Sequence, residues 1–365
     1  MAGGLRRLGV AIVGTGDIAK SYVADLPRHE HLRLVGVTDL DVEKARAFAA
    51  THGTRAYGSM AEALDDSEVE LIACLTSHRA HPAVVTAALN AGRHAFSEKP
   101  MAPTFAEARQ LIDLAGQRGV RLAAAPIAPL GELAQTARRW VTDGRLGQVR
   151  LAYADVNWGR IETWHPNPDA FYEIGPLYDV GVYPLTQLTA LFGPVVEIRA
   201  SAHRLLEERT RVDGVAFRLG APDCVIAILQ LEGGPVVRLT VNFYVANPAR
   251  QRGIELHGDA GSLWLSNWFE FDGTLEHAPK GGDARQVSLL RKPEVKMPWA
   301  AGLEELAASV VEDRASLLDP EHAAHVVEVM ETIIAAADAG RAMAVTSRFA
   351  PPPPAPWAAE LKLAD

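Results

Sequence analysis

Asp179 and Tyr183, an aspartate and a tyrosine four residues apart, are the residues of this chain best suited to acid–base chemistry. The segment around them reads as helical, and side chains at that spacing share one face of a helix. Taking hydride from a carbinol carbon requires removal of the hydroxyl proton, which a phenol with a pKa of about 10 does poorly at neutral pH. A lysine ammonium nearby stabilises the phenolate and lowers that pKa. The pair therefore predicts proton transfer on an alcohol if a lysine lies close by.

Lys99, in the turn Glu98-Lys99-Pro100, is the candidate for that lysine. We assign Tyr183 as the acid/base, Lys99 as the cation that tunes it and holds the substrate oxygen, and Asp179 as the carboxylate that orients substrate or Lys99. The roles of Lys99 and Tyr183 could be exchanged, because a desolvated lysine can itself act as a base. The structural alternatives are a solvated Lys99 and a Tyr183 packed in the core of its helix.

A dinucleotide-binding fingerprint stands near the start of the chain. Gly14 to Ala19 follow an apolar strand and open a helix, so the glycines allow a tight turn and a close approach to a pyrophosphate, which the free amides of the helix bind. Asp39 follows about 20 residues later, where an acid holds the ribose hydroxyls. A carboxylate repels a 2′-phosphate, so we expect NAD rather than NADP, although Lys44 or Arg46 could accommodate NADP.

These segments resemble the glucose-fructose oxidoreductase, inositol dehydrogenase and rhizopine catabolism family. The resemblance lies in Thr76 to His81, in Glu98-Lys99-Pro100 and in Asp179 to Tyr183, in that order. Ser77 replaces a usual proline, Gly175-Pro176-Leu177 departs from a usual glycine triplet, and Tyr183 replaces a histidine, as in glucose-fructose oxidoreductase and the dimeric dihydrodiol dehydrogenases. His81 has a cofactor or a structural role. The predicted cofactor-binding residues are Gly14, Thr15, Gly16, Asp17, Ile18, Asp39, Thr76, His81, Glu98 and Lys99.

The segment from Asn157 to Asn167 is rich in aromatic and hydrogen-bonding side chains. Such a mixture suits a carbohydrate, whose ring faces stack on indoles while its hydroxyls need donors and acceptors. Each of these residues alone could equally serve to pack a loop. The predicted substrate residues are Trp158, Arg160, Trp164, His165 and Tyr172.

The order of strands and helices predicts an α/β protein of two domains. Residues 1–127 alternate strands with helices, which indicates an N-terminal Rossmann domain with a parallel sheet. Beyond Pro126 strand follows strand, so residues 128–365 are expected to form a C-terminal α+β domain with a large, mostly antiparallel open sheet for substrate binding and oligomerisation. Ser59 with Glu62, and Thr104 with Glu107, predict capped helices. Residues 351–354 are expected to be an extended surface tail.

Composition narrows the partners of the 365-residue chain. A net charge of −9 argues against nucleic acid, and no apolar run is long enough for a membrane span. The two cysteines, Cys74 and Cys224, lie in apolar strands and are expected to be buried free thiols, with no metal site, in a reducing cytoplasm. The apolar-alternating strands and the resemblance predict a homodimer or homotetramer.

The leading hypothesis is an NAD(P)-dependent oxidoreductase that moves hydride between nicotinamide and a sugar, a polyol or a related cyclic alcohol. One alternative is a glycosidase that transiently oxidises its substrate with bound NAD, as some members of the family do. The other is a cofactor-binding regulator without turnover. The presence of Lys99, Asp179 and Tyr183 disfavours the regulator.

Overall fold

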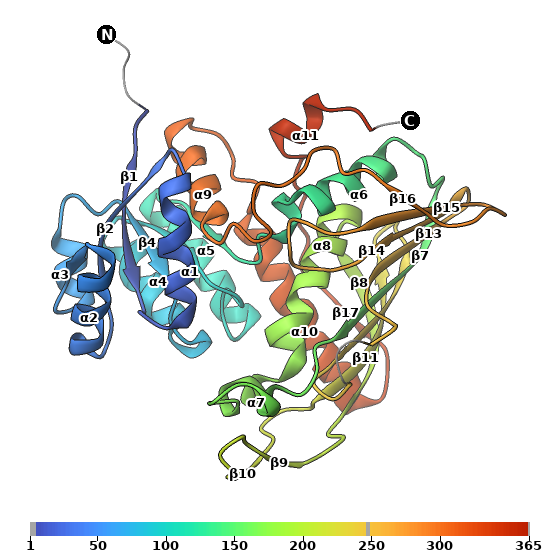
Figure 1. Cartoon of the computed structure of the whole chain (residues 1–365), viewed down its shortest axis with the longest axis horizontal. Helices are drawn as coiled ribbons and strands as arrows, with labels where there is room; N and C mark the ends of the chain where they lie inside the picture. Colours follow the sequence, from blue (N-terminus) through green and yellow to red (C-terminus); the bar gives the residue numbers. More distant parts are fainter. Residues whose placement is uncertain (1–4, 246–248, 364–365) are drawn as a thin grey trace. The chain divides into compact units, whose positions relative to one another are not determined.

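The chain, described here from a computed structural model over residues 5–245 and 249–363, divides into two compact units. The first consists of Met1–Ile127 and Pro298–Val327, and the second of Ala128–Met297 and Glu328–Asp365 (Figure 1). The prediction of one continuous second domain over residues 128–365 therefore needs correction, because residues 298–327 pack with the first unit.

The sheet of the first unit is entirely parallel and has the order β3-β2-β1-β4-β5-β6. Its direction of winding reverses between β1 and β4, and ligands of such sheets bind beyond the carboxyl ends of the strands at that point. The strands are β1 (Leu8–Val13), β2 (Leu32–Thr38), β3 (Arg55–Ala56), β4 (Leu71–Cys74), β5 (His94–Ser97) and β6 (Leu122–Ala124).

Helices cover both faces of this sheet, as predicted for a Rossmann domain. Apolar residues of α4 (His81–Asn90) and α5 (Phe105–Arg118) pack on one face with alternate strand residues. Tyr22 of α1 (Asp17–Asp25) packs near Phe96 and Trp299 on the other, with α9 (Ala301–Val311). The remaining helices are α2 (Val42–His52) and α3 (Met60–Asp65). The predicted caps are present: the hydroxyls of Ser59 and Thr104 accept hydrogen bonds from the amides of Glu62 and Glu107.

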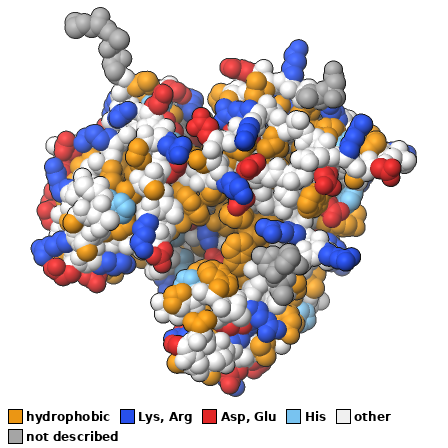
Figure 2. Space-filling model, in the orientation of Figure 1, with side chains coloured by type: hydrophobic (Ala, Val, Ile, Leu, Met, Phe, Trp, Pro, Cys, Tyr) orange, Lys and Arg blue, Asp and Glu red, His pale blue; other side chains and the backbone are white. Residues whose placement is uncertain are grey.

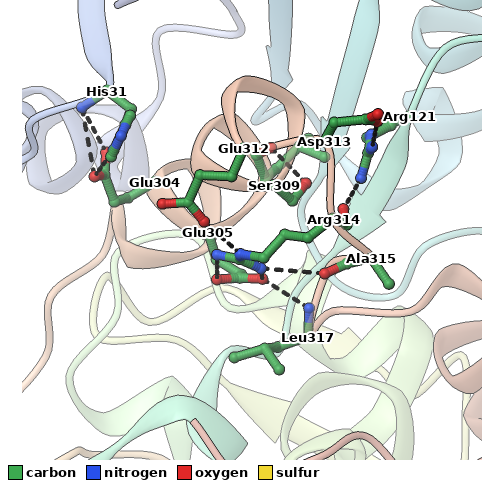
Figure 3. Close-up of polar contacts among 11 residues, drawn as sticks. His31, Arg121, Glu304, Glu305, Ser309, Glu312, Asp313, Arg314, Ala315 and Leu317 are labelled. Carbon is green, nitrogen blue, oxygen red and sulfur yellow. Dashed lines mark hydrogen bonds and ion pairs between the residues drawn. The ribbon is translucent and has the colours of Figure 1, made fainter. Parts of the chain in front are cut away.

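Polar contacts hold the returning segment 298–317 to the first unit (Figure 3). The main-chain amide of His31 donates to the carboxylate of Glu304, and its ring Nδ1 lies 2.7 Å from Glu304 Oε1. Arg314 makes two hydrogen bonds of 2.7 and 2.9 Å to Glu305, whose carboxylate also accepts the Leu317 amide. Arg121 donates to Asp313 Oδ1 at 3.0 Å. The contacts of His31 with Glu304 and of Arg121 with Asp313 join residues far apart in the sequence, so no local pattern predicts them.

The second unit is built on a nine-stranded sheet of order β16-β15-β14-β13-β7-β12-β11-β8-β17. All neighbours are antiparallel except β7 and β12, which confirms the expected mostly antiparallel sheet. The strands are β7 (Val149–Asn157), β8 (Val195–His203), β11 (Cys224–Leu231), β12 (Val236–Asn242), β13 (Gly253–Gly258), β14 (Gly261–Leu265), β15 (Leu275–Pro279), β16 (Arg285–Val287) and β17 (Met343–Ala344). A separate hairpin pairs β9 (Glu208–Thr210) with β10 (Ala216–Arg218).

Helices line one face of this sheet (Figure 1). Side chains of α6 (Glu132–Thr142) and α8 (Val182–Phe192) meet Ile254 and Leu256 of β13 and Leu265 of β14 around a small internal cavity. The other helical elements are α7 (Asp169–Pro176), η5 (Leu177–Gly181), α11 (Pro356–Glu360) and the part of α10 (Pro320–Ala339) from Glu328 onward. Helix α6 differs from the prediction, which places only strands and loops in this part of the chain.

The proline-rich segment 351–354 is extended, as expected, but it is fastened to α6. Arg138 donates to the carbonyl of Pro352 at 2.9 Å, and the Ala355 amide donates to Gln135 Oε1 at 3.0 Å. The Arg291 guanidinium lies 3.9 Å from the ring centre of Trp357, just beyond. The segment is therefore part of the second unit's packing.

Candidate active site

The glycine turn after β1 has the geometry that a dinucleotide needs. Gly14 has φ = 98°, and a Cβ there would lie 2.7 Å from the carbonyl oxygen of Leu75, so only glycine fits. No atom from elsewhere in the described residues lies within 4 Å of a Cβ placed on Gly16. Packing does not require that glycine, whereas a close approach of a pyrophosphate does. Asp17 and Ile18 form the first turn of α1, whose free amides bind anions.

Asp39, at the end of β2, is tied to the same turn. Its Oδ2 accepts hydrogen bonds from the amide of Thr15 at 2.7 Å and from the Thr15 hydroxyl at 2.8 Å. Burial acts to raise the pKa of Asp39, but these hydrogen bonds outweigh it and hold the pKa below its ordinary value. Lys44 Nζ lies 3.6 Å from Asp39 Oδ2, whereas Arg46 is paired with Glu43. Lys44 therefore lies beside the carboxylate that is expected to face the ribose, whereas Arg46 is engaged by Glu43.

His81 joins two of the predicted cofactor segments. Its Nδ1 lies 2.7 Å from the carbonyl oxygen of Pro100, and its Nε2 lies 3.3 Å from that of Thr76. Burial lowers the pKa of His81, so the ring is neutral at pH 7 and carries one N–H to donate. This geometry favours the structural role for His81: it holds the Glu98-Lys99-Pro100 turn against the end of β4.

Glu98 is also fixed. Its Oε1 accepts a hydrogen bond of 2.7 Å from the Tyr22 hydroxyl, and its Oε2 accepts the Lys99 amide at 2.9 Å. The peptide bond between Lys99 and Pro100 is cis. The main chain that carries Lys99 is therefore held on both sides, by Glu98 and by His81.

Asp179 lies in a π-helical turn rather than in the regular helix that was expected. Gly175, with φ = 74° and ψ = 170°, interrupts α7, and a Cβ there would lie 2.7 Å from the carbonyl oxygen of Pro222. The chain then forms the π-helix η5 and continues as α8, which begins one residue before Tyr183. Such turns insert one extra residue into a helix and occur frequently at functional sites. Asp179 is buried, and Tyr183 is partly exposed.

Tyr183 belongs to an aromatic cluster of four residues. Its ring centre lies 5.8 Å from Trp268 and 5.9 Å from Phe269. Trp158 lies 5.5 and 6.0 Å from the same two rings, so the predicted substrate segment and the predicted acid/base share neighbours. The sequence analysis missed Trp268 and Phe269. They lie in a turn between two β-strands and match no motif, so only their aromatic character could have drawn attention to them.

The other predicted substrate residues are not all brought together. The Arg160 guanidinium lies 4.4 Å from the ring centre of Tyr244, and Trp164 is exposed beside His165, with ring centres 5.5 Å apart. Tyr172 is 1% exposed and donates its hydroxyl to Glu162, so burial and that bond raise its pKa. Tyr172 is thus a packing residue of the second unit.

Arg209, which the sequence analysis did not single out, is the centre of that buried network. Its side chain is fully buried, hydrogen-bonds to Glu162 Oε1 at 2.7 Å and pairs with Asp223. It also lies 4.8 Å from the ring centre of Tyr172. One guanidinium of the β9–β10 hairpin therefore fixes the loop before Trp164, the helix α7 and the start of β11.

The described residues hold no group of three or more His, Cys, Asp or Glu that could bind a metal ion. Both cysteines are free and buried, and burial raises the pKa of Cys74 to about 11. Over the described ranges, no helix combines the length and the apolar character that crossing a bilayer requires.

Comparison with known proteins agrees with both halves of this description. The family model described as an oxidoreductase family with an NAD-binding Rossmann fold matches residues 8–125, and the C-terminal domain model of the same family matches residues 134–264. A trans-1,2-dihydrobenzene-1,2-diol dehydrogenase from Oryctolagus cuniculus is 31% identical over 227 residues. That alignment covers 61% of this chain and 65% of the relative, so it spans slightly less than two thirds of the curated protein.

Two solved structures show the same fold. An aldose-aldose oxidoreductase from Caulobacter crescentus, complexed with glycerol, superposes with a TM-score of 0.79 at 23% identity over 93% of this chain and all of that chain. An NAD-binding oxidoreductase from Klebsiella pneumoniae superposes with a TM-score of 0.81 at 20% identity over the same shares. The sheet of the first unit is parallel, its glycine turn suits a dinucleotide, and both domain models of one family match in order. The chain therefore belongs to the Gfo/Idh/MocA family of NAD(P)-binding oxidoreductases.

Proposed function

We propose that this protein is an NAD(P)-dependent dehydrogenase or reductase acting on a carbinol or carbonyl carbon of a sugar, a polyol or a related cyclic alcohol. The observation that carries the proposal is the position of Tyr183 just after the π-helical turn that holds Asp179, with the Tyr183 ring beside Trp268 and Phe269, which also contact Trp158. A proton-transfer group beside a stacking surface suits a cyclic alcohol.

The catalytic roles follow from the chemistry of the side chains. A bound nicotinamide supplies the hydride chemistry. Tyr183 accepts the hydroxyl proton on oxidation and returns it on reduction, Lys99 stabilises the phenolate and the substrate oxygen, and Asp179 orients substrate or Lys99. These groups also permit a second assignment, in which Lys99 is the base and Tyr183 is its partner.

The substrate class rests on the relatives and on the aromatic cluster. The relative most similar among those reported above acts on a trans-diol of a six-membered ring, and the Caulobacter enzyme acts on aldoses. Both substrates present a ring with a secondary hydroxyl group. Trp158 supplies a stacking face, and Arg160, Trp164 and His165 remain the proposed polar and aromatic contacts.

NAD is the proposed cofactor, with Gly14, Gly16 and the start of α1 at the pyrophosphate and Asp39 at the adenosine ribose. Because the pKa of Asp39 lies below its ordinary value, the carboxylate is ionised at neutral pH. An ionised carboxylate accepts hydrogen bonds from ribose hydroxyls and repels a 2′-phosphate. Lys44, at 3.6 Å, weakens that repulsion without reversing it.

A homodimer or homotetramer is the proposed assembly, joined through the uncovered face of the nine-stranded sheet. Ile226 and Ile228 are 42% and 44% exposed on that face, and Arg238 of the next strand lies 4.2 Å from the ring centre of Tyr153. Large apolar side chains aligned on an open sheet face favour burial against another copy. The two free buried thiols fit a reducing, cytoplasmic compartment.

The experiment is a substrate panel of aldoses, polyols and cyclic trans-diols, each incubated with NAD+ or NADP+ while nicotinamide absorbance is followed. We expect turnover with at least one ring-shaped secondary alcohol, and faster turnover with NAD+. Binding of NAD(H) without turnover of any panel member would support the non-catalytic alternative. Cofactor that copurifies and is never consumed during glycoside cleavage would support the glycosidase.

A further inference from the structure

An open cavity of about 590 Å³ lies in the second unit, at the ends of β13, β14 and β15. It is lined by Ala249, Arg250 and Arg252, by Trp264 of β14, by residues of the turn 266–274 and by Lys296. That volume falls in the range of small-molecule sites. The cofactor and substrate residues discussed above do not include any of its lining residues.

Three cations and two carboxylates line this cavity, so the net charge of its lining is +1. Arg250, Arg252 and Lys296 line it, and none of the three forms an ion pair with any residue in the ranges 5–245 and 249–363. Elsewhere many arginines pair with carboxylates, as Arg150 does with Asp259, and Figure 2 shows side chains of both charges interspersed on the face that it draws. In a chain of net charge −9, three cations without an anionic partner around one hollow favour an anionic ligand.

The walls of the cavity also carry groups that bind sugar rings. Trp264 is partly exposed, and its indole N–H donates to the carbonyl of Arg252 at 2.9 Å, which fixes the ring. Glu270 and Asp272 supply carboxylate oxygens that accept hydrogen bonds from hydroxyl groups. Indole faces and carboxylates together recognise carbohydrate rings.

The turn that forms one wall is preorganised by two side chains. Asn267 Oδ1 accepts the amides of Phe269 at 3.1 Å and Glu270 at 2.9 Å, and its Nδ2 donates to the carbonyl of Asp272. Ser266 Oγ accepts the Thr274 amide at 2.8 Å. The same turn directs Trp268 and Phe269 towards the ring of Tyr183. Two adjacent surfaces are thus built on one rigid turn.

We propose that this cavity binds the anionic group of an acidic or phosphorylated sugar. Arg250, Arg252 and Lys296 contact the carboxylate or phosphate, Trp264 stacks on the ring, and Glu270 and Asp272 accept hydroxyl hydrogen bonds. The proposal rests on the proposed function only in taking the ligand to be a carbohydrate.

Isothermal titration of the full chain with D-glucose, D-glucuronate and D-glucose 6-phosphate tests the proposal without requiring turnover. We expect at least one anionic sugar to bind about tenfold or more tightly than D-glucose, and the affinity to fall as salt is raised. Comparison of the two anionic sugars distinguishes a carboxylate from a phosphate ligand. In Arg250→Gln/Arg252→Gln/Lys296→Gln the advantage over D-glucose should be lost.

The matched control is Lys280→Gln/Lys292→Gln/Arg341→Gln, which removes the same charge from exposed positions outside the cavity. This control should bind the anionic sugar as the wild type does. Equal binding of all three sugars by the wild type, or equal weakening in both triple variants, would overturn the proposal. NAD(H) titration of each variant is read separately, so a failure of the cavity proposal is distinguishable from a failure of the proposed oxidoreductase function.

Discussion

At the scale of single residues, the charge of Asp39 is central to the proposed cofactor site. Asp39 is ionised, accepts two hydrogen bonds from Thr15 and lies 3.6 Å from Lys44. Sequence spacing alone predicted its position, because the distance from a glycine turn to the end of the second strand is set by the βαβ unit. Its hydrogen bonds to Thr15 were not predictable, since they depend on the loop conformation.

Replacing Asp39 with alanine should weaken NAD(H) binding by about tenfold, because the ribose hydroxyls lose a hydrogen-bond acceptor. It should also reduce the preference for NAD(H) over NADP(H), because no carboxylate then repels the 2′-phosphate of NADP(H). Fluorescence-quenching titration measures both constants. Glu294→Ala, which removes an exposed carboxylate from the second unit, is the control and should leave the ratio unchanged. An unchanged ratio in Asp39→Ala would remove Asp39 from cofactor selection.

His81 should make stability depend on pH. Burial lowers its pKa in the folded state, whereas an unfolded histidine has a pKa of about 6.5. The unfolded chain therefore binds the proton first as the pH falls, so the stabilisation is present above about pH 6.5 and is lost below it, towards the folded pKa. Urea unfolding at pH 7.5 and 5.5 should show a smaller difference in His81→Gln than in the wild type. The exposed control His203→Gln should keep the wild-type difference; an equal difference in all three proteins would contradict this role.

At the scale of elements, regular patterns were predictable and local irregularities were not. Apolar residues alternate with polar ones along β8 and form a nearly uninterrupted run in β11, and both patterns are typical of strands. The helix α6 was overlooked although Leu133, Ala137 and Trp140 recur at helical spacing, because the prolines before it were taken to open a region of strands. The π-helical turn depends on the contact of Gly175 with Pro222, which is distant in sequence. Likewise Trp268 and Phe269 adjoin Tyr183 only through tertiary packing.

The hairpin of β9 and β10 should depend on Arg209. Replacing Arg209 with methionine leaves Glu162 and Asp223 buried without their cation, so the free energy of unfolding should fall by roughly 3–5 kcal/mol. Arg211→Met, two residues along the chain, removes a partly exposed pair with Asp169 and should cost less than about 1 kcal/mol. Urea unfolding followed by tryptophan fluorescence compares them. Similar losses in the two variants would show that the buried network does not stabilise the hairpin.

At the scale of the whole molecule, the sequence indicated the two-sheet architecture but not the return of residues 298–327 to the first unit. Nothing in the residues of α9 themselves shows which sheet this helix covers. Pairings such as His31 with Glu304 join opposite ends of the chain. Only the folded structure identifies them.

The open face of the nine-stranded sheet should hold copies of the chain together. Light scattering at micromolar concentration should give a dimer or a tetramer for the wild type. Ile226→Asp/Ile228→Asp should shift the protein towards monomer, because two charges on an apolar interface disfavour its burial. The control Ile226→Val/Ile228→Val keeps the apolar face and should keep the assembly. A monomeric wild type would contradict the proposed interface.

Single-turnover and steady-state kinetics of Tyr183→Phe, Lys99→Ala and the double variant, on a substrate identified in the panel, test the central claim most directly. Removal of an acid/base group typically lowers the rate by about 10²- to 10⁴-fold, so we expect kcat to fall by that order in each single variant while NAD(H) affinity changes little. The double variant should be little worse than either, since the two groups act on one proton. Tyr178→Phe, which removes the phenol hydroxyl of the π-helix that precedes Tyr183, is the control and should retain turnover. A Tyr183→Phe enzyme with near-normal kcat would contradict the account and remove Tyr183 from the reaction.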